Sequence, residues 1–198
     1  TIGNAVRQRI RKEAQTFLMP GERPQLVSGV QALKKDGVQV NVNQLGEEVL
    51  GNAEAQRHMD AYLDLLKTPG VDTISVKTSS VCAQLSVIAF ETSLTRVCAA
   101  LRVLYRAAME NPDACQKLVM LDMEAYRDLE LTYQAFTTVL DEPEFQTLTA
   151  GIVLQAYLPD SHDVHKRLLA WSARRQAAGG ALVQLRLVKG ANLAVERI

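Results

Sequence analysis

Short segments of β-branched and aliphatic residues alternate along the chain with longer segments whose apolar residues recur at helical spacing. The short segments are residues 38–43, 73–78, 117–121, 151–157 and 183–188, and each follows or begins with a glycine or proline breaker. Between them, apolar stripes at three- to four-residue steps run through residues 55–66, 94–108, 126–140 and 164–171. This pattern predicts a regular alternation of β-strands and amphipathic helices.

Strands that are joined by helical crossovers run parallel, so the alternation predicts an α/β fold. No glycine-rich phosphate turn of the G-x-G-x-x-G or Walker type occurs in the chain, which favours a (β/α)8 barrel over a doubly wound sheet. Because a complete barrel takes about 250 residues, we expect about five of the eight units here. They occupy residues 37–198, after an N-terminal helical segment in residues 1–36. Asp160 or Ser161 is the expected N-cap of the last helix.

Composition narrows the classes of function. Lysine plus arginine is 22 and aspartate plus glutamate is 22, so no net charge favours nucleic acid or an anionic membrane. The odd number of cysteines, without C-x-x-C spacing, is typical of a reducing compartment. No apolar run has the length of a membrane span, and no signal peptide is visible. We therefore expect a cytoplasmic protein without a nucleic-acid or metal site, with His162 and His165 on a helix surface.

Polar side chains stand near the carboxyl end of every predicted strand, which is where a barrel builds its active site. In chain order they are Asn41, Asn43, Glu47, Lys77, Asp122, Glu124, Gln155, Arg186 and Lys189. Three of these residues are cations, and buried cations require carboxylates or an anionic ligand. The pattern predicts a cationic pocket beside an acid. Such a pocket stabilises negative charge on a cofactor ring, holds a substrate carboxylate or binds phosphate, and the residue types alone do not choose.

Four strings of residues carry a resemblance to a known family. They are Ile-Ser-Val-Lys-Thr-Ser-Ser at 74–80, Leu-Asp-Met-Glu-Ala-Tyr-Arg-Asp-Leu at 121–129, Gly-Ile-Val-Leu-Gln-Ala-Tyr-Leu-Pro-Asp at 151–160 and Leu-Arg-Leu-Val-Lys-Gly-Ala at 185–191. In this order they resemble the barrel motifs of proline dehydrogenase. The residues of the last two strings are similar to those of one branch of the family, in which this domain is fused to a glutamate semialdehyde dehydrogenase.

The resemblance implies FAD-dependent oxidation of L-proline to pyrroline-5-carboxylate by hydride transfer, with membrane quinone as electron acceptor and peripheral association at the inner face of the membrane. It assigns Lys77 to the proline carboxylate, Arg186 to the reactive region of the flavin with Asp122 as ion partner, and Gln155 to a hydrogen bond with the flavin ring. Other positions follow from the same motifs: Val188, Lys189, Gly190 and Ala191 line the flavin, while Glu47 and Asn43 lie on the substrate side. The family's substrate-binding arginine pair belongs to a final barrel helix, which lies beyond Ile198.

Two alternatives stay open at this point. A barrel with five of its eight strands has two unpaired edges, which predicts association and fits a catalytically silent fragment with a structural or assembly role. The second alternative is a lyase or aldolase that uses Lys77 as a Schiff-base amine.

Other residues are interpreted as structural. The pair Arg174 and Arg175 falls on a helix and is interpreted as a solvated face. Four aromatic residues on helical stripes are expected in the core or between helices and barrel, namely Tyr62, Tyr105, Tyr133 and Trp171.

Overall fold

The computed structural model describes residues 18–44, 49–110, 116–123 and 125–189, together with residues 3, 6, 9, 10 and 13. The described elements, in chain order, are α2 (Arg23–Lys35), β1 (Asn41–Asn43), α3 (Asn52–Leu66), β2 (Thr73–Lys77), α4 (Thr78–Val81), α5 (Phe90–Met109), β3 (Leu118–Asp122), the 3-10 turn η1 (Tyr126–Asp128), α6 (Leu129–Leu140), the 3-10 turn η2 (Pro143–Phe145), β4 (Gly151–Gln155), α7 (Pro159–Ala177) and β5 (Gln184–Val188). The predicted alternation of strands and helices is therefore confirmed.

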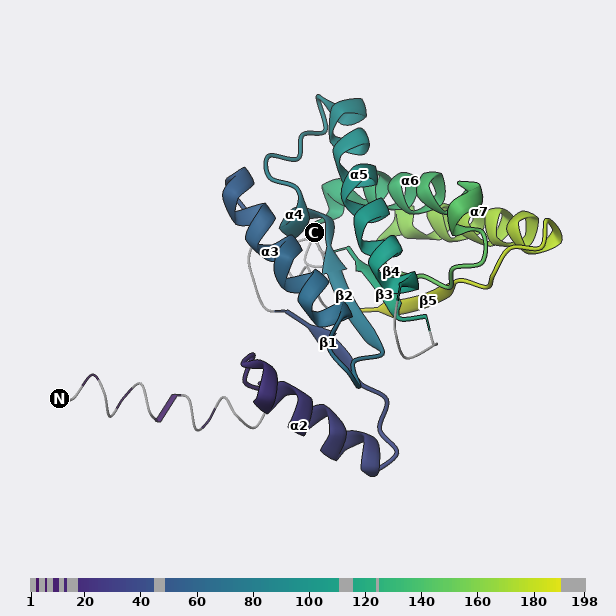
Figure 1. Cartoon of the computed structure of the whole chain (residues 1–198). Helices are drawn as coiled ribbons and strands as arrows, with labels where there is room; N and C mark the ends of the chain where they lie inside the picture. Colours follow the sequence, from purple (N-terminus) through teal and green to yellow (C-terminus); the bar gives the residue numbers. More distant parts are fainter. Residues whose placement is uncertain are drawn as a thin grey trace.

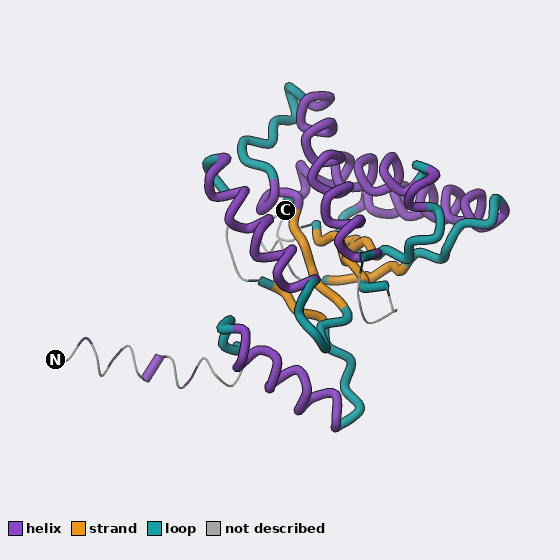
Figure 2. Tube along the Cα trace, in the orientation of Figure 1, coloured by secondary structure: helices purple, strands orange, loops and turns teal. Residues whose placement is uncertain are grey.

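The five strands form one sheet in which sequence order equals spatial order, β1-β2-β3-β4-β5, and every neighbouring pair is parallel. This order is the one that successive β-strand, helix, β-strand units produce when each crossover places the next strand beside the last. Figure 1 shows α3, α5, α6 and α7 gathered on one side of the strands, and Figure 2 shows the same layers by element type. The α/β fold that the sequence predicts is confirmed.

Alternate residues of each strand point to opposite faces of the sheet. One face is apolar and packs against the helices in a single core. Its strand residues are Ile74, Val76, Val119, Leu121, Ile152 and Leu154. The helices contribute residues such as Tyr62, Tyr105 and Trp171 to the same core, as the sequence predicts, together with Cys98. Because this face is filled by helices, the opposite face is the one that remains for polar side chains.

The helix α2 packs beside β1 and adds to the same core. Leu26 and Val30 are its buried residues. Ion pairs join Arg23 to Asp64 on α3, with 3.4 Å between Nη1 and Oδ1, and Lys34 to Asp72, with 2.6 Å between Nζ and Oδ2. These contacts hold α2 against the C-terminal end of α3 and the turn that precedes β2. The division of the chain at residue 36 stays a prediction.

Several local expectations differ from the structure. The first and fourth strands are shorter than predicted, at Asn41–Asn43 and Gly151–Gln155. The third strand ends with Asp122 rather than before it, because the register extends to that residue. The N-cap of α7 is Leu158, without a side-chain cap, because Pro159 opens the helix with a backbone angle that already suits its first turn. The interpretation of both arginines of the 174–175 pair as solvated is wrong for Arg175, which is only 6% exposed.

Candidate functional site

The face of the sheet that the helices leave open carries the polar residues of the candidate site. The register pairs Lys77 with Asp122 and Gln155 with Val188, and Arg186 pairs with Val153 on the same face. Asp122 is 8% exposed and Gln155 is completely buried. Of the residues assigned from the sequence, Lys77, Asp122, Gln155, Arg186 and Val188 are thus gathered by the sheet at the carboxyl ends of four adjacent strands.

An ion pair between Asp122 and Arg186 is the central contact of this face. Nη2 of Arg186 lies 2.5 Å from Oδ1 of Asp122, and the pair joins β5 to β3 across the intervening β4. The Asp122 side chain is 11% exposed and that of Arg186 is 38% exposed. A charge-assisted hydrogen bond to a largely buried carboxylate is stronger than an exposed one, because water screens it less. The ion pair that the sequence resemblance implies is therefore formed in the structure.

The sequence reasoning missed a second donor to the same carboxylate. The hydroxyl of Ser75, on β2, donates to Oδ1 of Asp122 at 3.3 Å. The amide of Asn41, on β1, donates in turn to the Ser75 hydroxyl, with 3.0 Å between Nδ2 and Oγ. Ser75 is 1% exposed. Its place two residues before Lys77, on the same strand face, is the signal that points to it.

Lys77 ends β2, and its backbone is held by residues of two helices. Ser80, on α4, donates its hydroxyl to the Lys77 carbonyl oxygen at 2.8 Å. The Tyr62 hydroxyl, from α3, lies 3.1 Å from the Ser80 hydroxyl oxygen and shares a hydrogen bond with it. Burial raises the pKa of Tyr62 above its ordinary value of 10.0, so the phenol stays neutral in this contact. The position of Lys77 is thus fixed from behind the sheet by a buried hydroxyl pair.

Gln155 ends β4 between Asp122 and the last strand. Its side-chain amide donates to the Met123 carbonyl oxygen, with 3.3 Å between Nε2 and the oxygen. The backbone nitrogen of the next residue, Ala156, donates to the Val188 carbonyl oxygen at 2.8 Å. These contacts tie the ends of β3, β4 and β5 together around the fully buried glutamine.

The structure does not bring every predicted site residue into this group. Glu47, Gly190 and Ala191 are outside the described residues, and so is Glu124. Lys189 follows β5 and is exposed. Asn43 ends β1 and is exposed; it lines a cavity of about 650 Å³ between β1, α2 and α3. The roles of these residues stay predictions.

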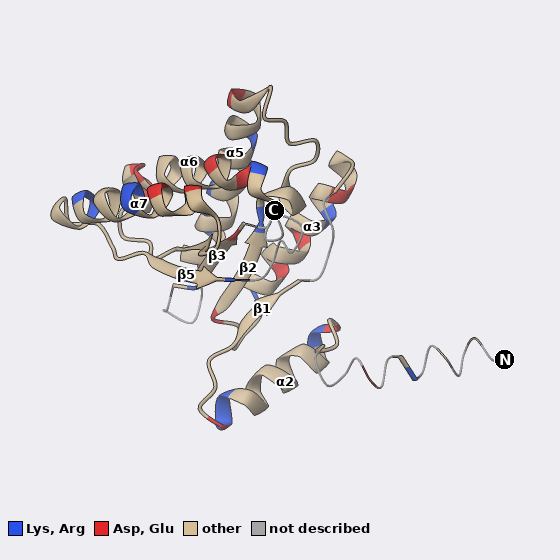
Figure 3. Cartoon of the chain, turned by 180° about the vertical axis from the view of Figure 1, so that it is seen from behind, with Lys and Arg blue, Asp and Glu red and all other residues tan. Residues whose placement is uncertain are grey.

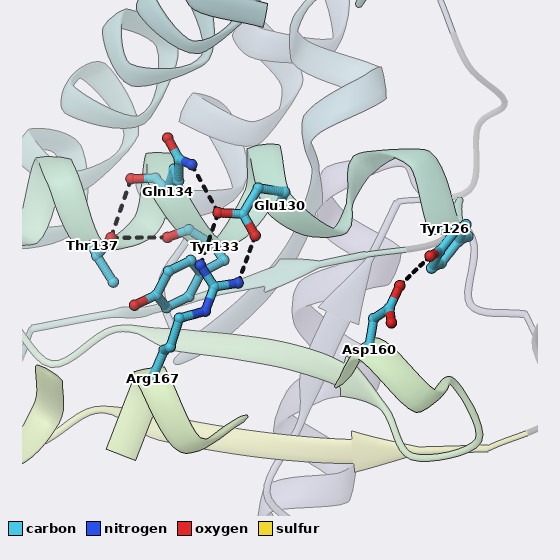
Figure 4. Close-up of polar contacts among 7 residues, drawn as sticks. All are labelled: Tyr126, Glu130, Tyr133, Gln134, Thr137, Asp160 and Arg167. Carbon is cyan, nitrogen blue, oxygen red and sulfur yellow. Dashed lines mark hydrogen bonds and ion pairs between the residues drawn. The ribbon is translucent and has the colours of Figure 1, made fainter. Parts of the chain in front are cut away.

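The loops that follow β3 and β4 are joined by contacts between their helices (Figure 4). The Tyr126 hydroxyl donates to a carboxylate oxygen of Asp160 at the start of α7. Further along, both oxygens of Glu130 on α6 accept hydrogen bonds from Arg167 on α7, at 3.0 and 2.6 Å. The Arg167 guanidinium also lies over the Tyr133 ring, 4.5 Å from its centroid. Together these contacts keep the two loops at a constant spacing beside the candidate site.

Charge elsewhere is dispersed rather than concentrated. Figure 3 shows basic and acidic residues interspersed along α6 and α7. Within the described ranges, no group of three or more histidine, cysteine, aspartate or glutamate side chains is arranged to hold a metal ion. Among the described helices, none combines the length and the apolar character needed to cross a membrane.

Known proteins with a similar sequence or structure all point to one family. The chain is similar to proline utilization A from Corynebacterium freiburgense, with 42% identity and a TM-score of 0.88 over 96% of this chain and 19% of that one. It is also similar to proline utilization A from Bdellovibrio bacteriovorus, inactivated by N-propargylglycine, with 28% identity and a TM-score of 0.86 over 99% of this chain and 22% of that one.

A curated proline dehydrogenase from Deinococcus radiodurans is 27% identical over 161 residues, which are 79% of this chain and 49% of that protein. The chain thus spans about half the length of this curated relative and about a fifth of the solved chains. A family model described as proline dehydrogenase matches residues 26–198. This match covers more than half of the chain, includes the strands that carry the ion pair, and shows that the chain belongs to the proline dehydrogenase family.

Proposed function

We propose that this chain takes part in the FAD-dependent oxidation of L-proline to pyrroline-5-carboxylate. The observation that carries the proposal is the Asp122–Arg186 ion pair on the open face of the sheet, in a chain of the proline dehydrogenase family. Lys77 is the register partner of Asp122, so the same face offers a second cation. A sheet face with two cations and one carboxylate suits a substrate that carries a carboxylate and a cofactor ring that becomes electron-rich.

The residues of this face fit a flavin ring. Nε of Arg186 is buried and has no hydrogen-bond partner among the described residues. A buried N–H group without an acceptor costs free energy, so it favours a ligand that supplies one. Flavin carries several acceptor atoms along one edge of its ring. Gln155, which is completely buried at the end of the neighbouring strand, would hold the ring beside Arg186.

Bound FAD supplies a two-electron acceptor that takes a hydride from proline. The protein's residues supply position and charge. In this proposal Lys77 would bind the proline carboxylate and so orient the proline ring. Arg186 would stabilise the negative charge that the flavin gains with the hydride. Asp122 keeps the guanidinium in place, so that little reorganisation is needed during the reaction. Val188 and Lys189, with Gly190 and Ala191 after them, are proposed to line the flavin, while Glu47 and Asn43 lie on the substrate side.

The proposal extends to partners. Proline utilization A proteins include one described as bifunctional, which is 24% identical to this chain with a TM-score of 0.69. We propose that the chain works in a longer protein with a second, aldehyde-oxidising dehydrogenase domain, in the cytoplasm, as an oligomer. Quinone is the proposed acceptor of the electrons, at the inner face of the membrane.

An anaerobic absorption spectrum of the chain with added FAD, recorded before and after L-proline, tests the proposal. We expect flavin bands in the protein fraction that bleach when proline is added. Arg186→Met should weaken FAD binding or slow bleaching by at least about tenfold, which corresponds to one lost charge-assisted hydrogen bond. Arg174→Met, which removes an exposed arginine of α7, is the control and should leave both unchanged. Bound flavin that proline never bleaches would contradict proline oxidation by these 198 residues alone, and absence of bound flavin would contradict the cofactor site.

The second candidate function is a catalytically silent piece with a role in assembly. The sheet order leaves β1 and β5 as edge strands, and Leu187 on β5 is 58% exposed. An apolar, unpaired edge favours pairing with another strand. The same absorption experiment separates the two functions, because this one predicts no flavin bands in the protein fraction.

A further inference from the structure

A chain of hydrogen bonds crosses the sheet and ends on the central ion pair. It begins at the Asn41 amide on β1, which donates to the Ser75 hydroxyl at 3.0 Å, and continues from Ser75 to Oδ1 of Asp122 at 3.3 Å. Arg186 reaches the same oxygen, Oδ1, from the opposite side at 2.5 Å. One carboxylate oxygen of Asp122 is therefore held between a hydroxyl from β2 and a guanidinium from β5.

The direction of each bond follows from the chemistry of the groups. An amide nitrogen only donates, and an ionised carboxylate only accepts. The lone pairs of the Ser75 oxygen are therefore used by Asn41, and the hydroxyl hydrogen is directed at Asp122. Asn41 thus sets the orientation of the hydroxyl, and the hydroxyl delivers its hydrogen to the carboxylate.

The two hydrogen-bond partners of Ser75, Asn41 and Asp122, differ in burial and therefore in how much they lose when the hydroxyl is removed. Asn41 is exposed, so its amide can bond to water when the hydroxyl is removed. Asp122 and Ser75 are 8% and 1% exposed, so water does not readily replace the lost donor there. The cost of losing the hydroxyl therefore falls on the Asp122 carboxylate, whose Oδ1 also accepts a hydrogen bond from Arg186.

Loss of the Ser75 hydroxyl also affects Arg186, because both groups bond to the Asp122 carboxylate. Arginine has a long side chain with many rotamers, and that of Arg186 is 38% exposed, so its own surroundings restrain it only in part. An Asp122 carboxylate that is fixed on the β2 side gives the guanidinium one defined position. Loss of the Ser75 donor removes one restraint on the carboxylate and so weakens the restraint on the guanidinium that bonds to the same oxygen.

We propose that Ser75 is a positioning residue of this site: oriented by Asn41, its hydroxyl fixes the Asp122 carboxylate and thereby the place of the Arg186 guanidinium. The inference rests on the proposed function, because its effect on catalysis passes through Arg186. It deepens that function by adding to the site two residues, Ser75 and Asn41, that touch neither substrate nor cofactor in the proposed arrangement.

The test compares Ser75→Ala, which removes the hydroxyl, with Ser75→Thr, which keeps it. The first readout is the hydrogen exchange of the Arg186 Nη2 group, which bonds to Asp122, in ¹⁵N NMR spectra of the 198-residue chain without flavin. We expect Ser75→Ala to accelerate this exchange by about tenfold, the equivalent of one hydrogen bond to a charged group, and Ser75→Thr to restore it. Asn41→Ala should produce a smaller acceleration, because the hydroxyl remains but loses its orientation.

Ser93→Ala is the matched control. Ser93 is 2% exposed and also makes two hydrogen bonds, to the backbone of Ser86, but it lies at the start of α5. It should lower stability without changing the exchange of Arg186. Equal effects of Ser75→Ala and Ser93→Ala on that exchange, or a folded Ser75→Thr that fails to restore it, would overturn the proposal. If Ser75→Thr does not fold, Ser75→Cys, whose thiol donates weakly, must behave like Ser75→Ala.

The second readout uses flavin. Ser75→Ala should weaken FAD binding or slow flavin reduction by about tenfold while changing the KM for proline less, and it should have little further effect in an Asp122→Ala background. Additive effects of the two substitutions would show that Ser75 acts without Asp122 and would overturn the proposal. If the unmodified chain binds no flavin, the proposed function fails, while the exchange of Arg186 still decides the role of Ser75.

Discussion

Arg175→Met removes a buried cation from the end of the sheet opposite the candidate site. The guanidinium donates to five backbone carbonyls, which belong to Leu140, Phe145, Gln146, Leu148 and Ala181. These carbonyls lie at the end of α6, in and after η2, and in the turn before β5. Burial lowers the pKa of Arg175, as expected of a cation that is removed from water. One side chain thus ties together the segments that lead into the last two strands.

The expected loss in the free energy of unfolding follows from the number and kind of the hydrogen bonds that Arg175 makes. A hydrogen bond to a charged group contributes about 1.5–3 kcal/mol. The bonds do not add fully, because the two hydrogens on Nη2 serve three carbonyls and because burying the cation costs free energy. Each buried carbonyl left without a donor costs about 1–3 kcal/mol. Because the variant no longer buries a cation, part of this cost is offset, and we expect a net loss of about 3–5 kcal/mol. In a chain of this length it lowers Tm by roughly 6–20 °C.

Urea unfolding followed by far-UV circular dichroism measures this loss, with Arg174→Met as the control. Arg174 is the neighbouring residue on α7 but is exposed, so its removal should change the free energy of unfolding by less than about 0.5 kcal/mol. A loss for Arg175→Met below about 1 kcal/mol, or equal to that of the control, would refute the reasoning. It would mean that the carbonyls find other donors when the guanidinium is gone.

Three further substitutions test other contacts. Gly180→Ala places a methyl group 2.6 Å from Cγ and 2.9 Å from the carbonyl oxygen of Arg175, so thermal unfolding should show a loss of about 1–3 kcal/mol. Tyr105→Phe removes a buried hydroxyl that has no partner among the described residues, and should stabilise the protein by about 1 kcal/mol in urea. Burial raises the pKa of Tyr105 above 10.0, so the native state keeps a proton that the unfolded chain releases; stability therefore falls above about pH 10, and less steeply in the phenylalanine variant. Glu130→Gln breaks a half-exposed ion pair with Arg167 and should cost less than about 1 kcal/mol, a cost that shrinks in 1 M salt.

The sequence by itself determined the order of the strands and helices and the face on which the polar residues lie. Both are local properties: the spacing of apolar residues distinguishes helix from strand, and alternation along a strand places Lys77 and Ser75 on one face. Parallel strands in sequence order then place the strand that ends with Lys77 beside the strand that ends with Asp122. The core assignments of Tyr62, Tyr105 and Trp171 follow from the same periodicity.

The tertiary structure decided which polar groups meet. Ser75 and Asp122 are 47 residues apart in the chain, and only their register across β2 and β3 brings the hydroxyl to the carboxylate. Arg174 and Arg175 are adjacent and alike in sequence, but the turn of the helix directs one to water and the other to carbonyls as far as 35 residues away. A hydrogen bond depends on distance and direction between atoms from separate elements, so it is set by the packing of those elements and not by the pattern within either one.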